Sequence, residues 1–371
     1  MMPNNDPILA AGSWQGNNKI IDLESFGATA KVYKAWNSSL NQEVALKRYD
    51  LNEVSEKLKS RILEEPNLPI KNPDVAKAFE VFKEGNYLNA VMPFIEGKTL
   101  GDVLIERGQL NITPATYVVI CLAKVSEEFH RHQIVLSDLK PDNIKIMTDG
   151  RVIILDITSW ERIGYRPEVS GGTFPYAPQE LFFKQLLSPA TDTYTIGMTY
   201  FELLVGTDDL NELTTSHESE LKQGVRKLDI SQIRVAHPEA YTFISKAIEP
   251  NPHNRYQSSS EMLNDLLPYY ESLTGTSATH QTVFSLITHM GNELSICAGH
   301  SIFGRQQIDP NNNYVSREQF ELNFDGKALA IKNLSRINTT LVNERPARDW
   351  TKLNDGDVIK LANVILRVRA A

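Results

Sequence analysis

The sequence predicts an α+β fold in two parts: a large region of strands followed by helices, and a smaller all-β module behind it. Short alternating apolar runs dominate from Lys19 to about Ala90, and such runs are typical of strands. From Leu100 onward, apolar residues recur at three- and four-residue spacing, which indicates helices. After residue 281, short apolar runs separated by turn residues predict about ten strands.

The first ninety residues divide into three expected pieces. Residues 1–18 are polar and contain Pro, Asn and Gly, so we expect a flexible leader. A β-rich lobe should follow, interrupted by one helix over residues 53–65. Pro66 and Pro69 should end that helix, because proline lacks the N–H that a helix needs.

The helical part begins its longest segment at Thr113-Pro114, and a second apolar helix is expected over residues 192–205. A third helix should start at Ser258 and close at Leu267, before a proline. Residues 272–281 are small and polar, and they predict a linker to the all-β module at 282–371.

The charge of the chain is unevenly distributed. The net charge is -8, but residues 282–371 hold 11 Lys and Arg against 9 Asp and Glu, so the rest holds 27 against 37. An acidic larger part argues against nucleic acid as a partner, and a mildly basic module suits an anionic one.

The two cysteines, Cys121 and Cys297, lie far apart in apolar contexts without metal-site spacing. We therefore expect buried free thiols in a reducing compartment. The sequence also shows no apolar stretch of membrane-spanning length and no signal peptide, so a cytoplasmic protein with no membrane span is expected.

One short stretch carries the chemistry. Residues 136–143 contain Asp138, Lys140 and Asn143, and Asp156 follows at the end of an apolar run. Phosphoryl transfer from ATP needs such a set: a carboxylate for the hydroxyl proton, a cation for the moving phosphoryl group, and an amide and a carboxylate for the metal ions.

Two segments upstream complete the set. Lys47 ends a strand-like run, where it can direct an ammonium group to the phosphates. The loop from Ser25 to Val32 keeps Gly27, and its small residues let the backbone approach an anion.

Together these segments resemble a bacterial eukaryotic-like (Hanks-type) Ser/Thr protein kinase domain over residues 19–271. The resemblance implies a bilobal fold with an N-lobe at 19–92 and a C-lobe at 97–271. Further segments agree in the same order along the chain. Residues 90–97 resemble the hinge, 129–135 the approach to the catalytic loop, and 172–180 the end of the activation segment. Residues 192–197 resemble the anchoring helix, and 251–256 supply an arginine expected to pair with Glu180.

The resemblance also implies roles. Asp138 would orient the substrate hydroxyl, and Lys140 would touch the γ-phosphate of ATP. Asn143 and Asp156 would hold Mg²⁺, for which Mn²⁺ could substitute. The nucleotide would be bound by Gly27, Val32, Ala45, Lys47, Glu64, Met92 and Ile95. Glu64 is the choice for the helix glutamate that pairs with the lysine, and Glu65 is the alternative.

Three departures from the family pattern stand out. Ser137 replaces an arginine that clamps a phosphate on the activation segment, so activity should not depend on such a phosphate through this position. Thr158 replaces a glycine and should stiffen the segment after Asp156. Lys145 stands where an apolar residue floors the adenine, and its stem could cover the base while its ammonium reaches water.

The C-terminal module carries Arg305 after a short strand and Ser316 in a loop, and arginine with a hydroxyl makes a good phosphate receptor. With the segment 333–343 they resemble a forkhead-associated (FHA) domain over 282–371, a β-sandwich that binds phosphothreonine peptides. The residues implied for the phosphopeptide are Arg305, Ser316, Arg317 and Asn338, with Arg336 as a further candidate. Gln319 stands where the family has His, and Thr339 where it has Gly.

The sequence therefore predicts a Ser/Thr protein kinase of bacterial signalling that is fused to a phosphothreonine reader. Its partners would be protein substrates with Ser or Thr, and either a phosphothreonine-containing protein or its own phosphorylated linker. One alternative is a pseudokinase that serves as an ATP-responsive FHA adaptor. The other is a small-molecule kinase on the same fold, against which the segment at Thr173 argues because it resembles a peptide-positioning loop.

Overall fold

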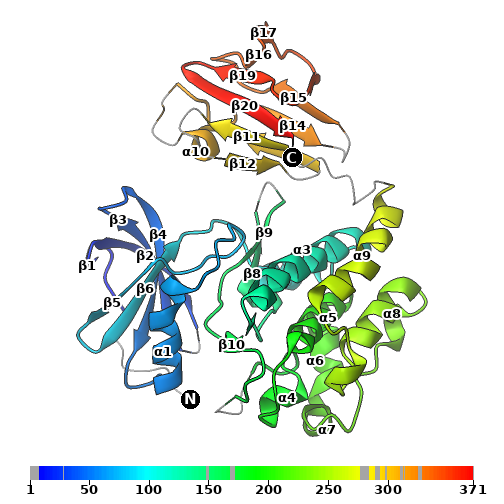
Figure 1. Ribbon diagram of the computed structural model, residues 1–371. Coiled ribbons are helices and arrows are strands. Elements are labelled where there is room, and N and C mark those ends of the chain that lie inside the picture. Colours follow the sequence, from blue (N-terminus) through cyan, green and yellow to red (C-terminus); the bar gives the residue numbers. More distant parts are fainter. Residues whose placement is uncertain are drawn as a thin grey trace. The chain divides into compact units, whose positions relative to one another are not determined.

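The structure is a computed structural model. It describes residues 8–27, 29–147, 150–167, 172–275, 284–288, 293–296, 299–309, 312, 314–324 and 328–370. The chain divides into two compact units: residues 1–145 with 152–263, and residues 146–151 with 264–371. Figure 1 shows strands β1 to β6 and the helices of the first unit, and the strands of the second unit.

An antiparallel sheet of six strands forms the N-terminal part of the first unit, in the order β1-β2-β3-β4-β6-β5. Its strands are β1 (Trp14–Gln15), β2 (Asn18–Phe26), β3 (Lys31–Asn37), β4 (Gln42–Asp50), β5 (Glu80–Glu84) and β6 (Tyr87–Pro93). The central strand β4 is buried on both faces because Ala45 and Tyr49 belong to one apolar cluster, and Val44 and Leu46 to another.

The sheet begins earlier than the sequence predicted. Trp14 pairs with Lys19, so part of the segment expected to be a flexible leader is a strand. Leu9 packs against the outer apolar cluster, and its backbone N–H donates to the Tyr33 hydroxyl over 3.3 Å. The physical reason is that β4 buries side chains on both faces, and the outer face needs this segment as its cover.

The inner face of the sheet is covered by α1 (Glu56–Glu64), which continues as the 3₁₀ turn η1 (Glu65–Asn67). Ser55 caps α1 by accepting a hydrogen bond from the Leu58 backbone N–H. Ile62 of α1 is fully buried in the cluster that contains Tyr49. The helix expected over 53–65 is thus confirmed, with its start two to three residues later.

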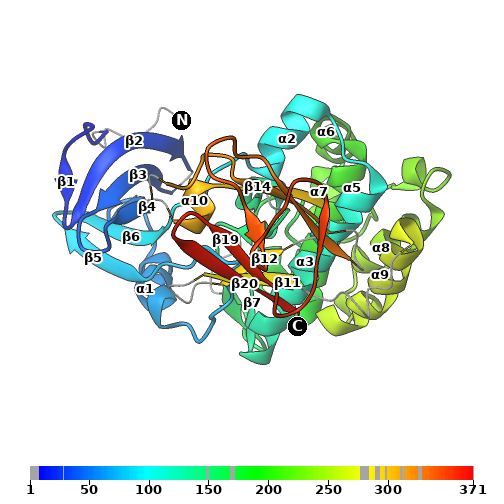
Figure 2. The same cartoon turned by 90° about the horizontal axis from the view of Figure 1, so that it is seen from above.

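The C-terminal part of the first unit is helical, and α5 lies at its centre. Figure 2 shows these helices on the opposite side of this unit from β1 to β6. The elements are α2 (Leu100–Arg107), α3 (Ile112–Arg131), β7 (Ile134–Val135), η2 (Pro141–Asn143), β8 (Ile144–Ile146), β9 (Val152–Ile154), β10 (Glu161–Arg162), α4 (Gln179–Phe182), α5 (Pro189–Val205), α6 (Thr207–Thr215), α7 (Glu218–Lys222), η3 (Ser231–Ile233), α8 (Pro238–Ala247) and η4 (Pro252–Asn254).

Helix α9 (Ser259–Thr274) corrects two expectations. It does not close before Pro268, which lies inside it. It also runs to Thr274, so the expected linker at 272–281 begins inside a helix; residues 276–281 lie outside the described part. A proline removes one backbone hydrogen bond, but the turns after it keep theirs, as the bond from the Gly275 N–H to the Glu271 carbonyl shows.

The second unit consists of two antiparallel sheets that enclose one apolar core. One sheet has the order β12-β11-β20-β19-β16-β17, and the other β13-β14-β15-β18. The strands are β11 (Phe284–Thr288), β12 (Glu293–Ile296), β13 (Gly299–Phe303), β14 (Phe320–Phe324), β15 (Leu329–Asn333), β16 (Leu341–Val342), β17 (Arg345–Pro346), β18 (Thr351–Leu353), β19 (Val358–Leu361) and β20 (Val364–Ala370). One short helix, α10 (Arg305–Ile308), interrupts the strands.

Phe320 and Leu322 of β14 and Leu366 and Val368 of β20 show why two sheets form. In each strand, every second residue is buried, and the buried faces belong to the same core. Among the described residues, no helix is both long and apolar enough to cross a bilayer.

The helical part is held by a fully buried ion pair. Arg255 donates from Nη1 to Glu180 Oε1 over 2.6 Å and from Nη2 to Oε2 over 3.1 Å, which confirms the pairing expected from the sequence. The guanidinium also donates to the carbonyls of Glu249, Ala190 and Pro250, so its N–H groups are well satisfied. A pair with this many bonds leaves an uncompensated carboxylate when the arginine is removed.

We predict that Arg255→Met lowers the free energy of unfolding by about 3 kcal/mol or more, because the Glu180 carboxylate stays buried without its partner. Urea denaturation of the full chain measures this loss. Arg226→Met is the matched control: Arg226 pairs with Glu220 near the surface, where a pair contributes less than about 1 kcal/mol. Equal losses in the two variants would contradict the prediction.

Candidate functional site

The loop after β7 brings the predicted catalytic residues together. The Asn143 side-chain amide donates to Asp138 twice, to its carbonyl and to Oδ2, each over 3.0 Å. Lys140 Nζ lies 3.0 Å from Asp138 Oδ2 and donates to the Thr173 hydroxyl over 2.7 Å. The other carboxylate oxygen of Asp138, Oδ1, is buried and has no hydrogen-bond partner among the described residues. That oxygen is therefore available to accept a hydrogen bond from a substrate.

A buried carboxylate fixes the shape of this loop. Asp192 of α5 is fully buried and accepts hydrogen bonds from the backbone N–H groups of Leu136 and Ser137 and from His130. Ser137 has a φ of 66°, a left-handed conformation that a non-glycine residue adopts only when its surroundings impose it. The two bonds from Asp192 to the adjacent N–H groups supply that constraint. Thr199 holds the next turn by donating to the Leu139 carbonyl over 2.7 Å.

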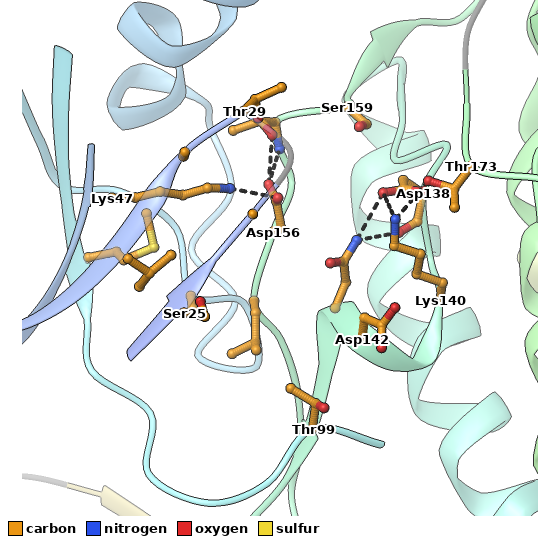
Figure 3. A pocket seen from close by; sticks show the side chains of 18 of the residues that line it. Ser25, Thr29, Lys47, Thr99, Asp138, Lys140, Asp142, Asp156, Ser159 and Thr173 are labelled. Atoms are coloured by element: carbon orange, nitrogen blue, oxygen red, sulfur yellow. Dashed lines mark hydrogen bonds and ion pairs between the residues drawn. The ribbon is translucent and has the colours of Figure 1, made fainter. Parts of the chain in front are cut away.

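Lys47 on β4 reaches across to Asp156, and the two form an ion pair of 2.6 Å (Figure 3). Burial alone would lower the pKa of Lys47 and raise that of Asp156. The attraction within the pair outweighs burial, so the pKa of Lys47 is raised and that of Asp156 falls to about 2. Both groups are therefore charged at neutral pH.

Thr158 has a role that its departure from the family pattern did not suggest. Its backbone N–H and its hydroxyl both donate to Asp156 Oδ1, over 2.9 and 2.7 Å. The predicted stiffening of this segment thus has a structural counterpart, because Thr158 bonds one carboxylate oxygen of Asp156, Oδ1, while Lys47 bonds the other, Oδ2.

The structure corrects the choice of the helix glutamate. Glu64 is exposed and accepts a hydrogen bond from Ser60 of its own helix. Glu65 is the buried one, and its Oε1 accepts from the Ala78 backbone N–H over 2.7 Å. The reason is helical periodicity: Glu65 follows the buried Ile62 by three residues and so lies on the same face, whereas Glu64 lies on the opposite face.

Burial raises the pKa of Glu65 to about 7, although the hydrogen bond from Ala78 and the charge of Lys47 both oppose the rise. Its Oε2 is buried and has no hydrogen-bond partner in the described part of the chain. A carboxyl group with one unsatisfied buried oxygen favours its neutral form, which agrees with the raised pKa.

One cavity of about 1050 Å³ contains the side chains of the catalytic loop together with Lys47 and Asp156. Ten of the eleven residues predicted for the catalytic, nucleotide and metal roles line it: Gly27, Val32, Ala45, Lys47, Met92, Ile95, Asp138, Lys140, Asn143 and Asp156. Glu64 is the exception. The lining also includes Ser137, which is 4% exposed, and Lys145 and Thr173. The cavity thus has an apolar end at Val32, Ala45 and Met92 and a charged end at Lys47 and Asp156.

The donor set fits a hard divalent cation. Asp156 offers a carboxylate and Asn143 an amide oxygen, and Mg²⁺ prefers oxygen ligands. Within the described ranges, no cluster of three or more His, Cys, Asp and Glu side chains is preformed around a metal position. Such a cluster is not required, because Mg²⁺ is usually held by one or two carboxylates together with substrate phosphates.

The second unit brings together the predicted phosphate residues. The Arg305 backbone N–H donates to the Ser316 carbonyl over 2.8 Å, and Arg305 Nε donates to the Val315 carbonyl over 2.9 Å. Asn338 donates from its side chain to the Tyr314 carbonyl over 2.6 Å. The structure therefore places Arg305, at the start of α10, beside the loop that carries Ser316, and Asn338 on a second loop bonded to that loop. The side chains of Arg317 and Arg336 are exposed beside them in the sequence, and nothing further fixes their role.

Ser335 belongs to this site, although the sequence did not single it out. Its hydroxyl oxygen accepts from the backbone N–H groups of Ile337 and Asn338 and lies 2.7 Å from the Ser316 hydroxyl. Two accepted bonds fill its two lone pairs, so its own O–H must donate to Ser316. The Ser316 proton is then left to donate to another acceptor, as an anion receptor requires. A serine three residues before Asn338 in a polar turn was the available signal.

Gln319 stands in for the family's histidine as a buried support. Its amide N–H₂ donates to the Asn338 carbonyl over 2.7 Å and to the Thr340 hydroxyl over 3.2 Å. Its amide oxygen accepts from the Ser316 backbone N–H over 3.1 Å. One fully buried side chain thus joins the two loops that carry Ser316 and Asn338.

Of the two cysteines, Cys121 is a free thiol with partial exposure rather than a fully buried one. Cys297 lies outside the described residues.

We predict that Glu65 makes the protein less stable as pH rises through neutrality. The folded state keeps the proton up to about pH 7, whereas the unfolded chain loses it near its ordinary pKa of 4.5. Between these values the native state binds more protons, so the free energy of unfolding falls as pH rises. Relative to Glu65→Gln, the wild type should lose about 3 kcal/mol between pH 4 and pH 8. Urea denaturation across this range measures it, and Glu64→Gln, which changes the exposed neighbour and keeps Glu65, should lose as much as the wild type.

The geometry agrees with comparisons against known proteins. A family model for the protein kinase domain matches residues 25–267, and one for the FHA domain matches residues 299–362. A probable serine/threonine-protein kinase of Clostridium perfringens is 28% identical over 268 residues, which cover 69% of this chain and 38% of that protein. The serine/threonine-protein kinase PknL of Mycobacterium tuberculosis is 28% identical over 67% of this chain and 64% of that protein. Rat cGMP-dependent protein kinase 2 is 25% identical over 66% of this chain and 32% of that protein.

The chain spans less than two fifths of the length of the Clostridium relative. The kinase model nevertheless matches more than half of the chain and includes every residue from Gly27 to Asp156 that lines the cavity. The chain belongs to the protein kinase family, and an FHA domain follows its kinase domain.

Proposed function

We propose that this protein is an ATP- and Mg²⁺-dependent Ser/Thr protein kinase whose FHA domain reads phosphothreonine, and that it acts in bacterial signalling. The observation that carries the catalytic half is one cavity in which Asp138, Lys140, Asn143, Lys47 and Asp156 converge with an unpartnered carboxylate oxygen. This set supplies the carboxylate, the cations and the metal-ligand groups that phosphoryl transfer uses.

Each residue then has a defined task. Asp138 Oδ1 accepts the hydrogen bond of the substrate hydroxyl and takes its proton as the new oxygen–phosphorus bond forms and the bond to the leaving diphosphate breaks. Lys140, already 3.0 Å from Asp138, faces the γ-phosphate and offsets its charge. Asn143 and Asp156 would hold the divalent cation, which supplies charge neutralisation at the phosphates.

Lys47 enters this scheme already charged and oriented. It bonds to Asp156, and its position on the buried strand β4 fixes the direction of its side chain. Nucleotide phosphates at the charged end of the cavity would add a second anionic partner to Lys47. Glu65, which is bonded to the Ala78 N–H, is close enough to affect the same charge.

The second half of the proposal rests on Arg305 at the start of α10 and on the loops that carry Ser316 and Asn338. A guanidinium and a hydroxyl can bind a phosphate group, and a side-chain amide can bond the peptide backbone beside it. A kinase domain and a phosphothreonine reader in one chain suit a protein that docks a phosphorylated partner or its own phosphorylated linker. In the linker region, Thr274 donates its hydroxyl to the Tyr270 carbonyl inside α9; Thr276, Thr279 and Thr282 lie outside the described residues.

We predict that Asp138→Asn lowers phosphoryl transfer by a factor of about 100 or more, because the amide cannot accept the hydroxyl proton. Transfer of radiolabelled γ-phosphate from Mg-ATP to a generic protein substrate measures it. Asp208→Asn, on the exposed start of α6, is the control and should retain full transfer. Nucleotide binding without transfer, in the wild type as in Asp138→Asn, would support the pseudokinase adaptor instead.

We further predict that Gln319→Leu weakens phosphothreonine-peptide binding by about tenfold, because the hydrogen bonds that hold Ser316 and Asn338, and a third to Thr340, are lost. Gln319→His should retain binding but add a pH dependence near the ordinary pKa of histidine, about 6.5. Fluorescence polarisation with a labelled phosphothreonine peptide measures both, and the unphosphorylated peptide is the control. Unchanged affinity in Gln319→Leu would exclude the supporting role.

A further inference from the structure

Lys145 on β8 does not send its ammonium into water, as its sequence position suggested. Nζ donates to the carbonyl of Ile95 over 2.7 Å, and it lies 6.0 Å from the centre of the Phe94 ring. The side chain is half-buried and lines the cavity that contains Lys47 and Asp156. A backbone bridge between Thr99 and Lys145 holds β8 beside the segment that follows Ile95. Lys145 is thus tied to the hinge at both its backbone and its ammonium.

The surroundings keep this cation in place. Burial lowers the pKa of Lys145, whereas Glu24, Asp102 and Glu96 all oppose that effect. An ammonium with an accepting carbonyl and three carboxylates nearby has favourable partners, so it has little reason to leave the cavity when a ligand arrives. The aliphatic part of the side chain remains available as an apolar surface for a ring.

The consequence concerns the hydrogen-bonding character of the hinge. A backbone carbonyl such as that of Ile95 ordinarily offers an acceptor to a ligand. Here one lone pair is used by Lys145, and any ligand N–H that reached the second would lie beside an ammonium group, which has donors only. A donor facing a charged donor is a repulsive element, and repulsive elements discriminate between ligands that are otherwise alike.

The position of the charged end indicates which part of a purine meets this carbonyl. Phosphates at Lys47 and Asp156 place the base at the apolar end of the cavity, so the ring edge opposite the sugar bond faces the hinge segment. Along that segment Met92 is buried, whereas Ile95 is partly exposed and nearer to Thr99 at the mouth. On that edge of the purine ring, C2 lies toward the sugar and C6 lies deeper in the cavity. C2 is therefore the ring atom directed toward Ile95.

We propose that Lys145 determines the purine selectivity of this site by rejecting an amino group at C2. The site would accept adenine and hypoxanthine rings and disfavour guanine and 2,6-diaminopurine. This inference rests on the proposed nucleotide binding, which it extends from a general ATP site to a specific discrimination among purines.

The experiment measures the affinity of the full-length protein for two ligand pairs that differ only by the 2-amino group: ADP with 2-amino-ADP, and IDP with GDP. In the wild type, the 2-amino member of each pair should bind more weakly. In Lys145→Met, which keeps an apolar stem and frees the Ile95 carbonyl, the ratio within each pair should shift by roughly fivefold in favour of the 2-amino member, about the effect of one hydrogen bond. Because the ratio compares two ligands on one variant, a general loss of stability cancels.

Lys34→Met is the matched control. Lys34 Nζ also lies near the Phe94 ring, at 4.5 Å, but it pairs with Glu43. Its removal should leave both ratios unchanged. The proposal is overturned if Lys145→Met binds these nucleotides and both ratios stay within twofold of the wild type, or shift the other way. If the wild type binds none of the four nucleotides, the proposed nucleotide site itself is wrong, which is a distinguishable result.

Discussion

The buried carboxylate of Asp192 is the constraint on which the catalytic geometry depends. It accepts hydrogen bonds from two consecutive backbone N–H groups and from His130, and so it forces Ser137 into a left-handed conformation. That conformation turns the chain so that Asp138, Lys140 and Asn143 face one cavity. An exposed carboxylate could not do this, because water would compete for the same N–H groups, whereas Asp192 is fully buried.

The FHA unit solves a similar problem with a neutral group. Gln319 is buried between two loops and bonds the backbone of both, so that Ser316 and Asn338 are presented together. Ser335 then fixes the direction of the Ser316 proton, because its own lone pairs are already filled. In both units a buried polar side chain positions residues that are proposed to contact a ligand. Such supports explain how exposed loops can hold a site to within a fraction of an ångström.

The departures from the family pattern change the surroundings of the site more than its chemistry. Thr158 restrains Asp156, and Lys145 bonds the hinge carbonyl of Ile95. Ser137 leaves no guanidinium at its position but keeps the backbone bonds that shape the loop. The residues proposed for phosphoryl transfer, Asp138, Lys140 and Asp156 among them, line one cavity, so under that proposal the altered positions bear on ligand selection and on control.

The sequence by itself determined the order of the elements and the two-part architecture, because these follow from periodicity and turn residues. Of the eleven site residues that the resemblance to the kinase family implied, ten line the cavity. Only the tertiary structure decided that Glu65 rather than Glu64 is buried, that the sheet starts at Trp14, and that α9 continues through Pro268. The tertiary structure also decided that the Lys145 ammonium bonds the Ile95 carbonyl. These outcomes depend on contacts between segments distant in the chain, such as the hydrogen bond from Ala78 to Glu65, which the spacing of apolar residues within one segment does not encode.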